Sequence, residues 1–176
     1  MSISNTIKSI QDIMRKDAGV DGDAQRISQL GWMLFLKVFD DYETEQELMS
    51  DDYESPIPER FRYRNWAHDE EGITGGALLE FIDELFKEMK EMELDENSPR
   101  LAFVVRSIFE DSYNYMKSGT LLRQVVNKLN EINFNKKADR HQFNDLYEKI
   151  LKDLQSAGNA GEYYTPRAVT KFMTQM

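Results

Sequence analysis

The 176-residue sequence contains no cysteine and only two histidines, His68 and His141. The lack of cysteine excludes disulfide bonds, zinc sites built from thiolates and catalysis by a thiol, and it suits a reducing compartment such as the cytoplasm. Two histidines are too few for a metal site with several histidine ligands in one chain. No metal site is therefore expected.

Long apolar stretches are also missing. A membrane-spanning helix needs about 18 or more consecutive apolar residues, and the chain has no such run. Its polar start, MSISNTIKSI, lacks the pattern of a signal peptide. We therefore expect a cytoplasmic protein without a membrane partner.

Positive charge is scarce overall, because the chain has 22 Lys and Arg but 32 Asp and Glu, which gives a net charge of −10. The deficit is confined to one half of the chain. Residues 1–99 have 10 basic and 24 acidic residues (−14), whereas residues 100–176 have 12 and 8 (+4). If DNA approaches this protein, the C-terminal half should face it. The simpler interpretation, which we favour, is that both halves are solvated surfaces.

Helical periodicity runs through most of the sequence and predicts an all-α fold of about five or six helices in a bundle-like arrangement. The first expected helix carries Ile3, Ile7, Ile10 and Met14, and another starts near residues 74–76. The remaining expected helices cover about 23–48, 99–116, 120–131 and 138–156. An irregular insert at about 50–76 contains two of the four prolines, and it leaves room for a short strand pair. The apolar stretch GWMLFLKVF predicts that the second helix is central.

Three stretches of the first 100 residues are candidates for chemistry. DAGVDGD (17–23) has the acids of a calcium loop, but Ser28 stands where the closing glutamate should be, so we reject calcium. The acids of FDDYETEQE include Asp40 and Asp41, which point about 100° apart on a helix and form no catalytic pair. We interpret them as a solvated face.

The third stretch, RFRYRNW, alternates Arg60, Arg62 and Arg64 with aromatic residues. An extended segment would place the arginines on one side, where they could contact phosphate or an acidic partner. The alternative, which we favour, is a loop held to the core by its aromatic side chains, with arginines paired to nearby acids.

The last stretch, GEYYTPRAVTKFMTQM (161–176), predicts a helix start with Thr165 as N-cap and Pro166 at the first helical position. No acidic residue follows Pro166, and Arg167 adds positive charge to the helix N-terminus. Such a terminus attracts a carboxylate or phosphate, and Tyr163 and Tyr164 could wall a flat ligand. An ordinary capped helix remains the alternative.

GEYYTPRAVTKFM resembles the G-[EQ]-[FY]-[YF]-T-P-R segment of the modification (HsdM) subunits of type I restriction-modification systems, which are adenine-N6 DNA methyltransferases. GWMLFLKVFDDYE and IPERFRYRNW also resemble parts of the N-terminal helical domain of that family. The resemblance covers essentially the whole chain. It implies an N-terminal helical domain at residues 1–157, followed at 158–176 by a linker and the first helix leading into a catalytic domain.

The resemblance further implies that the intact protein transfers a methyl group from S-adenosylmethionine to adenine N6. Thr165 would contact the carboxylate end of this cofactor. The implied cofactor-binding set is Glu162, Tyr163, Tyr164, Thr165, Pro166 and Arg167. The implied partners are a specificity subunit, a second modification subunit, a restriction subunit and DNA, and the domain would help to close around DNA and to contact those subunits.

Two motifs of that family are not in this chain: the D-P-x-C-G-T-G loop, which holds the cofactor, and N-P-P-[FY], which holds the flipped adenine. We therefore expect the chain to be an N-terminal fragment with no catalytic residues of its own and no activity alone. The alternative from another class is a stand-alone helical adaptor that binds a protein and has no enzyme attached.

Overall fold

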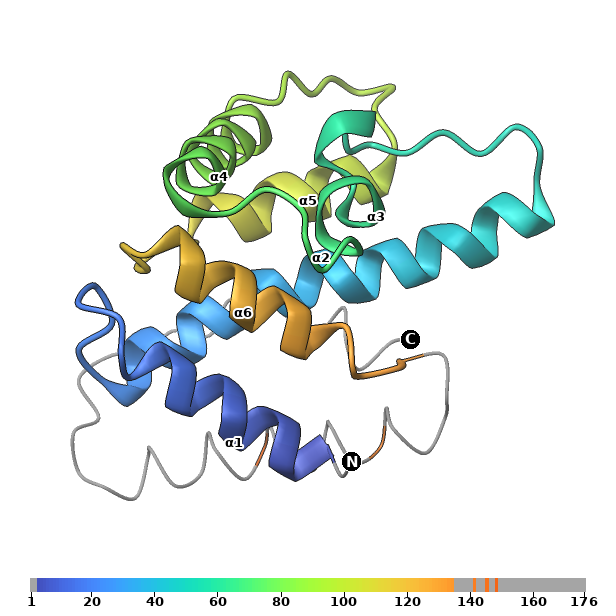
Figure 1. Ribbon diagram of the computed structural model, residues 1–176. Helices are drawn as coiled ribbons and strands as arrows, with labels where there is room; N and C mark the ends of the chain where they lie inside the picture. The colour runs from blue at the N-terminus through green and yellow to red at the C-terminus, as the bar shows by residue number, and fades with distance from the viewer. Residues whose placement is uncertain (1–2, 135–140, 142–144, 146–147, 149–176) are drawn as a thin grey trace.

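The computed structural model describes residues 3–134, 141, 145 and 148. Six α-helices and one 3₁₀ helix lie in this part of the chain (Figure 1). In chain order they are α1 (Ile3–Met14), α2 (Asp23–Met49), η1 (Glu59–Phe61), α3 (Tyr63–Ala67), α4 (Gly75–Lys90), α5 (Arg100–Glu110) and α6 (Gly119–Leu129). The all-α prediction is confirmed.

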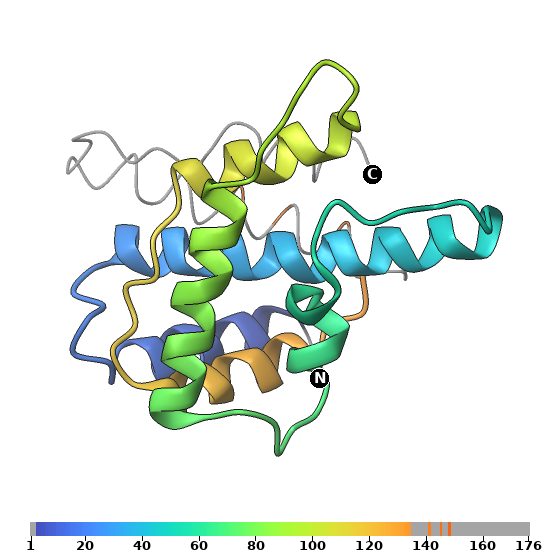
Figure 2. The ribbon, with the colours of Figure 1, turned by 90° about the horizontal axis from the view of Figure 1, so that it is seen from above.

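Helix α2 is the centre of the molecule, as predicted. Every residue from 31 to 40 is buried, which means that this part of α2 has packing partners on all sides. In Figures 1 and 2, α1 and α6 lie side by side along one flank of α2, and α4 and α5 lie on another. Beyond residue 40 the helix continues past the body of the domain, and its last turn ends in the exposed residues Leu48 and Met49 (Figure 2).

The outer helices form because each has one apolar face at helical spacing. In α1 the buried apolar residues are Ile3, Ile7, Ile10 and Met14, and in α4 they are Leu78, Ile82, Leu85, Phe86 and Met89. Aromatic side chains join the helices, with Trp32 of α2 and Phe109 of α5 both meeting the Phe86 ring edge to face at 5.0 Å between centroids. Both apolar faces were predicted from the sequence.

The insert at 50–76 differs from its prediction in one respect. No strand is present among the residues described, and η1 and α3 occupy the place of the expected strand pair. The N–H groups of Phe61 and Arg62 donate to the carbonyls of Pro58 and Glu59. Because these local bonds use the backbone groups that a strand partner would need, the alternating sequence folds as helical turns.

Helix α5 ends at Glu110 rather than at 116. The backbone N–H groups that follow it donate hydrogen bonds to side chains from distant parts of the sequence. Gln29 accepts a hydrogen bond from the Tyr115 N–H at 2.8 Å. The buried carboxylate of Asp17 accepts from the N–H groups of Lys117 and Ser118, each at 2.9 Å. These bonds join residues about 100 positions apart and fix the segment that leads into α6.

Helices α4 and α6 begin almost in contact. A Cβ at Gly119 would overlap the carbonyl oxygen of Gly75, and Gly75 itself has a φ of +61°. Two glycines are therefore required where these two helix starts meet. Of the predicted helix at 138–156, residues 141, 145 and 148 are described and are helical. The rest of that helix and the predicted domain boundary after residue 157 lie outside the described residues.

Candidate functional site

The predicted cofactor-binding residues Glu162, Tyr163, Tyr164, Thr165, Pro166 and Arg167 lie outside the described residues, so this site stays a prediction. Within the described part, chemistry-bearing side chains gather in two places on α2. One is a network of arginines and carboxylates, and the other is a polar pocket. Both lie where α2 meets the segment that contains α3.

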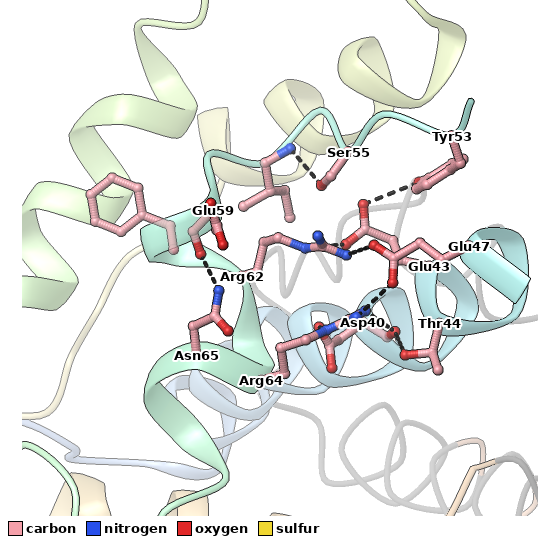
Figure 3. Close-up of polar contacts among 12 residues, drawn as sticks. Asp40, Glu43, Thr44, Glu47, Tyr53, Ser55, Glu59, Arg62, Arg64 and Asn65 are labelled. Carbon is pink, nitrogen blue, oxygen red and sulfur yellow. Dashed lines mark hydrogen bonds and ion pairs between the residues drawn. The ribbon is translucent and has the colours of Figure 1, made fainter. Parts of the chain in front are cut away.

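The ion network joins α2 to the two arginines that flank the start of α3 (Figure 3). Arg64 donates to the Asp40 carboxylate at 2.7 Å and to the Asp40 carbonyl oxygen at 3.1 Å. It also donates to Glu47 at 2.7 Å, and Arg62 donates to the other oxygen of Glu47. The Arg62 Nε lies 3.4 Å from the Glu43 carboxylate, which also accepts a hydrogen bond from the Tyr53 hydroxyl at 3.0 Å.

Two carboxylates of this network are buried in the domain. The side chains of Asp40 and Glu43 are 4% and 1% exposed. Burial raises the pKa of Glu43 above its usual value, although hydrogen bonds from Ser55 and Tyr53 and the charge of Arg62 oppose that change. For the more exposed Glu47, the hydrogen bond from Arg62 lowers the pKa. Carboxylates this buried need their arginines, because an unpaired buried charge is strongly destabilising.

The favoured interpretation of RFRYRNW, a loop held to the core by its aromatics, is confirmed. Phe61, Tyr63 and Trp66 are buried. Arg62 and Arg64 pair with acids of α2, and the exposed Arg60 pairs with Glu84 of α4. The extended conformation on which the other interpretation depended is not formed, because Glu59–Phe61 is a 3₁₀ helix and Tyr63–Ala67 is an α-helix.

The expectation of a solvated acidic face on FDDYETEQE is wrong for Asp40 and Glu43, which are both buried. Their partners, Arg62 and Arg64, lie 19 to 24 positions further along the chain. The sequence offered one signal, since an excess of acids on α2 preceded a cluster of arginines within a proline-rich connection. The pairing could not be deduced without knowing how that connection turns back.

The polar pocket lies at the neighbouring part of α2. It has a volume of about 430 Å³, and the residues that line it are Lys37, Asp41, His68, Asn130, Ile132 and Asn133. Two come from α2, one follows α3, and three follow α6, so the pocket forms only when these elements meet. Of these residues, only Asp41 stood out in the sequence as a candidate for chemistry, in an acid pair with Asp40 that was rejected.

Two polar side chains, one on α6 and one directly after it, set the geometry of the pocket. Asn130 accepts a hydrogen bond from the Tyr63 hydroxyl at 2.9 Å and donates to the Ala67 carbonyl at 2.8 Å. Arg123, two turns earlier, donates to the carbonyls of Trp66, Ala67, Asp69 and Ile73 at 2.9 to 3.3 Å. These bonds satisfy the free carbonyl groups at the end of α3. They therefore fix the position of His68 at the edge of the pocket.

Lys37 and Asp41 give the pocket charges of opposite sign. Burial lowers the pKa of Lys37, with Asp41 and Asp40 opposing that change. Burial raises the pKa of Asp41, against the opposing charge of Lys37. The ammonium of Lys37 lies 5.7 Å from the centre of the Tyr63 ring. Both groups are partly removed from water, so the pocket favours ligands that can replace that water.

Two further features are absent from the described residues. No group of three or more His, Asp or Glu there could hold a metal ion. No helix in that part of the chain is long and apolar enough to cross a membrane.

Comparison with known families places this fold. Residues 3–129 match the model of the HsdM N-terminal domain, which is more than half of the chain. The chain belongs to the HsdM N-terminal domain family. The matched range contains all of α1 to α6 and both arginines of the ion network.

Residues 138–176 match a second model, that of the N-6 DNA methylases. This range includes the predicted cofactor-binding residues 162–167.

Known relatives of this HsdM-family chain align with nearly its whole length. It is 65% identical to the type I restriction enzyme EcoEI methylase subunit of Escherichia coli, covering 98% of this chain and 36% of that protein. A solved modification subunit, assigned to a type I restriction enzyme of Vibrio vulnificus YJ016, is 37% identical with a TM-score of 0.76, over 98% of this chain and 39% of its own. The chain thus spans a little over a third of the length of these relatives.

A third relative comes from a structural study of complex assembly and conformational transition in the type I restriction-modification system. It is 31% identical, with a TM-score of 0.79 over 94% of this chain and 33% of its own.

Proposed function

We propose that this chain is the N-terminal helical domain of a type I modification subunit, and that the intact protein methylates adenine N6 in DNA with S-adenosylmethionine. The observation that carries the proposal is the 65% identity to the EcoEI methylase subunit over 98% of the chain. The match of residues 138–176 to N-6 DNA methylases adds support from the segment that contains Thr165. A stand-alone adaptor would have no reason to contain that segment.

In this proposal the helical domain is a rigid support rather than a catalyst. The protein would work in the cytoplasm with a specificity subunit, a second modification subunit, a restriction subunit and DNA. The less acidic half of the chain, residues 100–176, is the half expected to face DNA. The 176-residue chain alone is expected to have no methyltransferase activity.

Residues 162–167 are proposed to form one edge of the cofactor site. The Thr165 hydroxyl and the N–H groups at the helix start would bind the carboxylate of S-adenosylmethionine, with Arg167 adding positive charge. S-adenosylmethionine supplies the methyl group that is transferred. Tyr163 and Tyr164 would shield the bound methionine moiety from water.

The test uses the intact subunit assembled with its specificity subunit. Thr165→Val removes the hydroxyl at nearly constant volume, and we expect it to weaken S-adenosylmethionine binding about 10-fold by calorimetry, as expected for a lost hydrogen bond to a charged group. Thr170→Val, one turn later, is the matched control and should bind like wild type. Equal affinity in all three proteins would refute the Thr165 contact. Absence of N6-methyladenine in DNA treated with the wild-type complex would refute the proposed function itself.

A further inference from the structure

Lys37 and Asp41 are one helical turn apart on α2, at a spacing that usually lets opposite charges pair. Here they do not. In the described part of the chain, neither the Lys37 ammonium nor the Asp41 carboxylate forms a hydrogen bond or an ion pair. Asp40, between them in sequence, is fully engaged by Arg64. The two unpaired charges both line the pocket.

The unpaired state of Lys37 is unusual because the residue is only 6% exposed. Lysine is almost never this buried without a partner. Its ammonium contacts the face of the Tyr63 ring, which compensates only part of the lost hydration. A buried, unpaired charge at the wall of a pocket is typical of a binding site rather than of a supporting contact.

The rest of the pocket has the features of a preformed site. Its volume of about 430 Å³ lies within the range of small-molecule sites. Ile132 supplies an apolar wall, and His68 and Asn133 supply polar groups at the exposed edge. The Asn130 side chain is held at both ends by Tyr63 and Ala67, so this wall does not need to rearrange when a ligand enters.

We propose that this pocket binds a small zwitterion, of which an α-amino acid is the simplest example. The ligand's carboxylate would accept hydrogen bonds from the Lys37 ammonium, and its own ammonium would donate to the Asp41 carboxylate. A simple anion would meet the repulsion of Asp41, and a simple cation would meet that of Lys37. Only a ligand with both charges replaces the water lost by both residues. This site uses none of the residues 162–167 proposed for the cofactor.

The test is a titration of the isotope-labelled 176-residue chain, followed by the NMR resonances of residues 37, 41, 68 and 130. The probes are L-alanine, L-leucine and L-methionine, with acetate and methylammonium as ligands of a single charge. We expect at least one amino acid to shift these resonances with a dissociation constant at least 10-fold below that of either single-charge probe.

Variants assign the binding to the two charges. Lys37→Met and Asp41→Asn should each raise the dissociation constant of the best amino acid at least 10-fold, since each removes a charged hydrogen bond. Lys87→Met and Asp83→Asn, at exposed positions of α4, are the matched controls and should bind like wild type. Circular dichroism verifies that each variant is folded. If Lys37→Met does not fold, the more conservative Asp41→Asn still tests the proposal.

Two results would overturn the proposal. One is that no amino acid binds more tightly than acetate or methylammonium. The other is that Lys37→Met or Asp41→Asn retains the wild-type dissociation constant in a folded protein. Thr165→Val should leave this binding unchanged, which separates it from the proposed cofactor site.

Discussion

Asp40 and Asp41 are neighbours in the sequence, but they belong to two regions of the molecule that differ in how their charges are satisfied. Asp40 belongs to the ion network, where Arg62 and Arg64 supply hydrogen bonds to the acids of α2. Asp41 belongs to the pocket, where it and Lys37 have no such bond to any of the described residues. Paired charges hold two elements together, whereas partly or fully buried charges without a partner cost stability and remain available to a ligand.

The ion network supports the fold of this domain, whereas the pocket is the candidate for function. The network fixes α3 against α2 and braces the part of α2 that extends past the body. The pocket is built from the elements so fixed, because its residues come from α2, from the end of α3 and from the segment after α6. Replacing the arginines of the network should therefore destabilise the domain, and replacing the Lys37 charge of the pocket should not.

The largest expected effect is that of Arg64→Ala. It leaves the Asp40 carboxylate, 4% exposed, without its arginine. We expect the free energy of unfolding to fall by about 2 kcal/mol, below the full cost of a broken buried pair because Arg64 is a quarter exposed. Urea denaturation followed by circular dichroism measures the change.

Arg60→Ala is the control for that experiment. Arg60 and Glu84 are 61% and 57% exposed, so the loss of their pair should change stability by less than about 1 kcal/mol. Asp40→Asn in the Arg64→Ala background should recover part of the loss, because it removes the buried charge. Equal losses in Arg64→Ala and Arg60→Ala would show that the network is no stronger than a surface pair.

The next effect has the opposite sign. Lys37→Met removes a buried charge that has no ion pair with any residue the structure describes, and we expect it to raise the free energy of unfolding by about 1 kcal/mol at neutral pH. The pKa of Lys37 is lowered in the folded state, so its destabilising effect is present below that folded pKa and disappears as pH rises through it toward 10.5. The gap between variant and wild type should therefore narrow in alkaline solution. A loss of stability in Lys37→Met would mean that the charge is satisfied in the free domain.

The smallest expected effect is that of Glu43→Gln, within the network itself. Burial raises the pKa of Glu43, so its ionised form costs stability above the folded pKa, and this cost is relieved as pH falls through that value toward 4.5. Glutamine at this position should raise the free energy of unfolding by about 0.5 kcal/mol at pH 7, since only the net charge cost of Glu43 is removed. Melting temperatures at several pH values should show this advantage vanishing by pH 4.5. An advantage that grows on acidification would contradict the raised pKa.

Much of the fold could be predicted from the sequence because its signals are local. The apolar spacing of Ile3, Ile7, Ile10 and Met14 defines one face of a helix whatever lies against it. The end of α5 was predicted six residues too late because Gln29 and Asp17, far away in sequence, hold the backbone at 115–118. Local patterns do not record such partners.

The two candidate sites also differ in whether local sequence patterns could predict them. Residues 162–167 could be proposed as a cofactor contact because the chemistry of a helix start is contained in a few consecutive residues. The pocket could not be proposed, because Lys37, His68 and Asn130 come from three separate parts of the chain. Lys37 lies in an apolar stretch of the sequence. Nothing in that stretch predicts that its ammonium has no hydrogen bond or ion pair among the described residues.

By itself, the sequence determined the fold class, the central position of α2, the aromatic contacts of RFRYRNW with the core and the family resemblance. These properties depend on spacing and residue type within short stretches. Only the tertiary structure decided which acids of α2 are buried and paired, and which line a pocket. That outcome depends on where the segment containing η1 and α3 turns back onto α2, and the bonds that fix its position come from Arg123 and Asn130 on a helix more than 50 residues later.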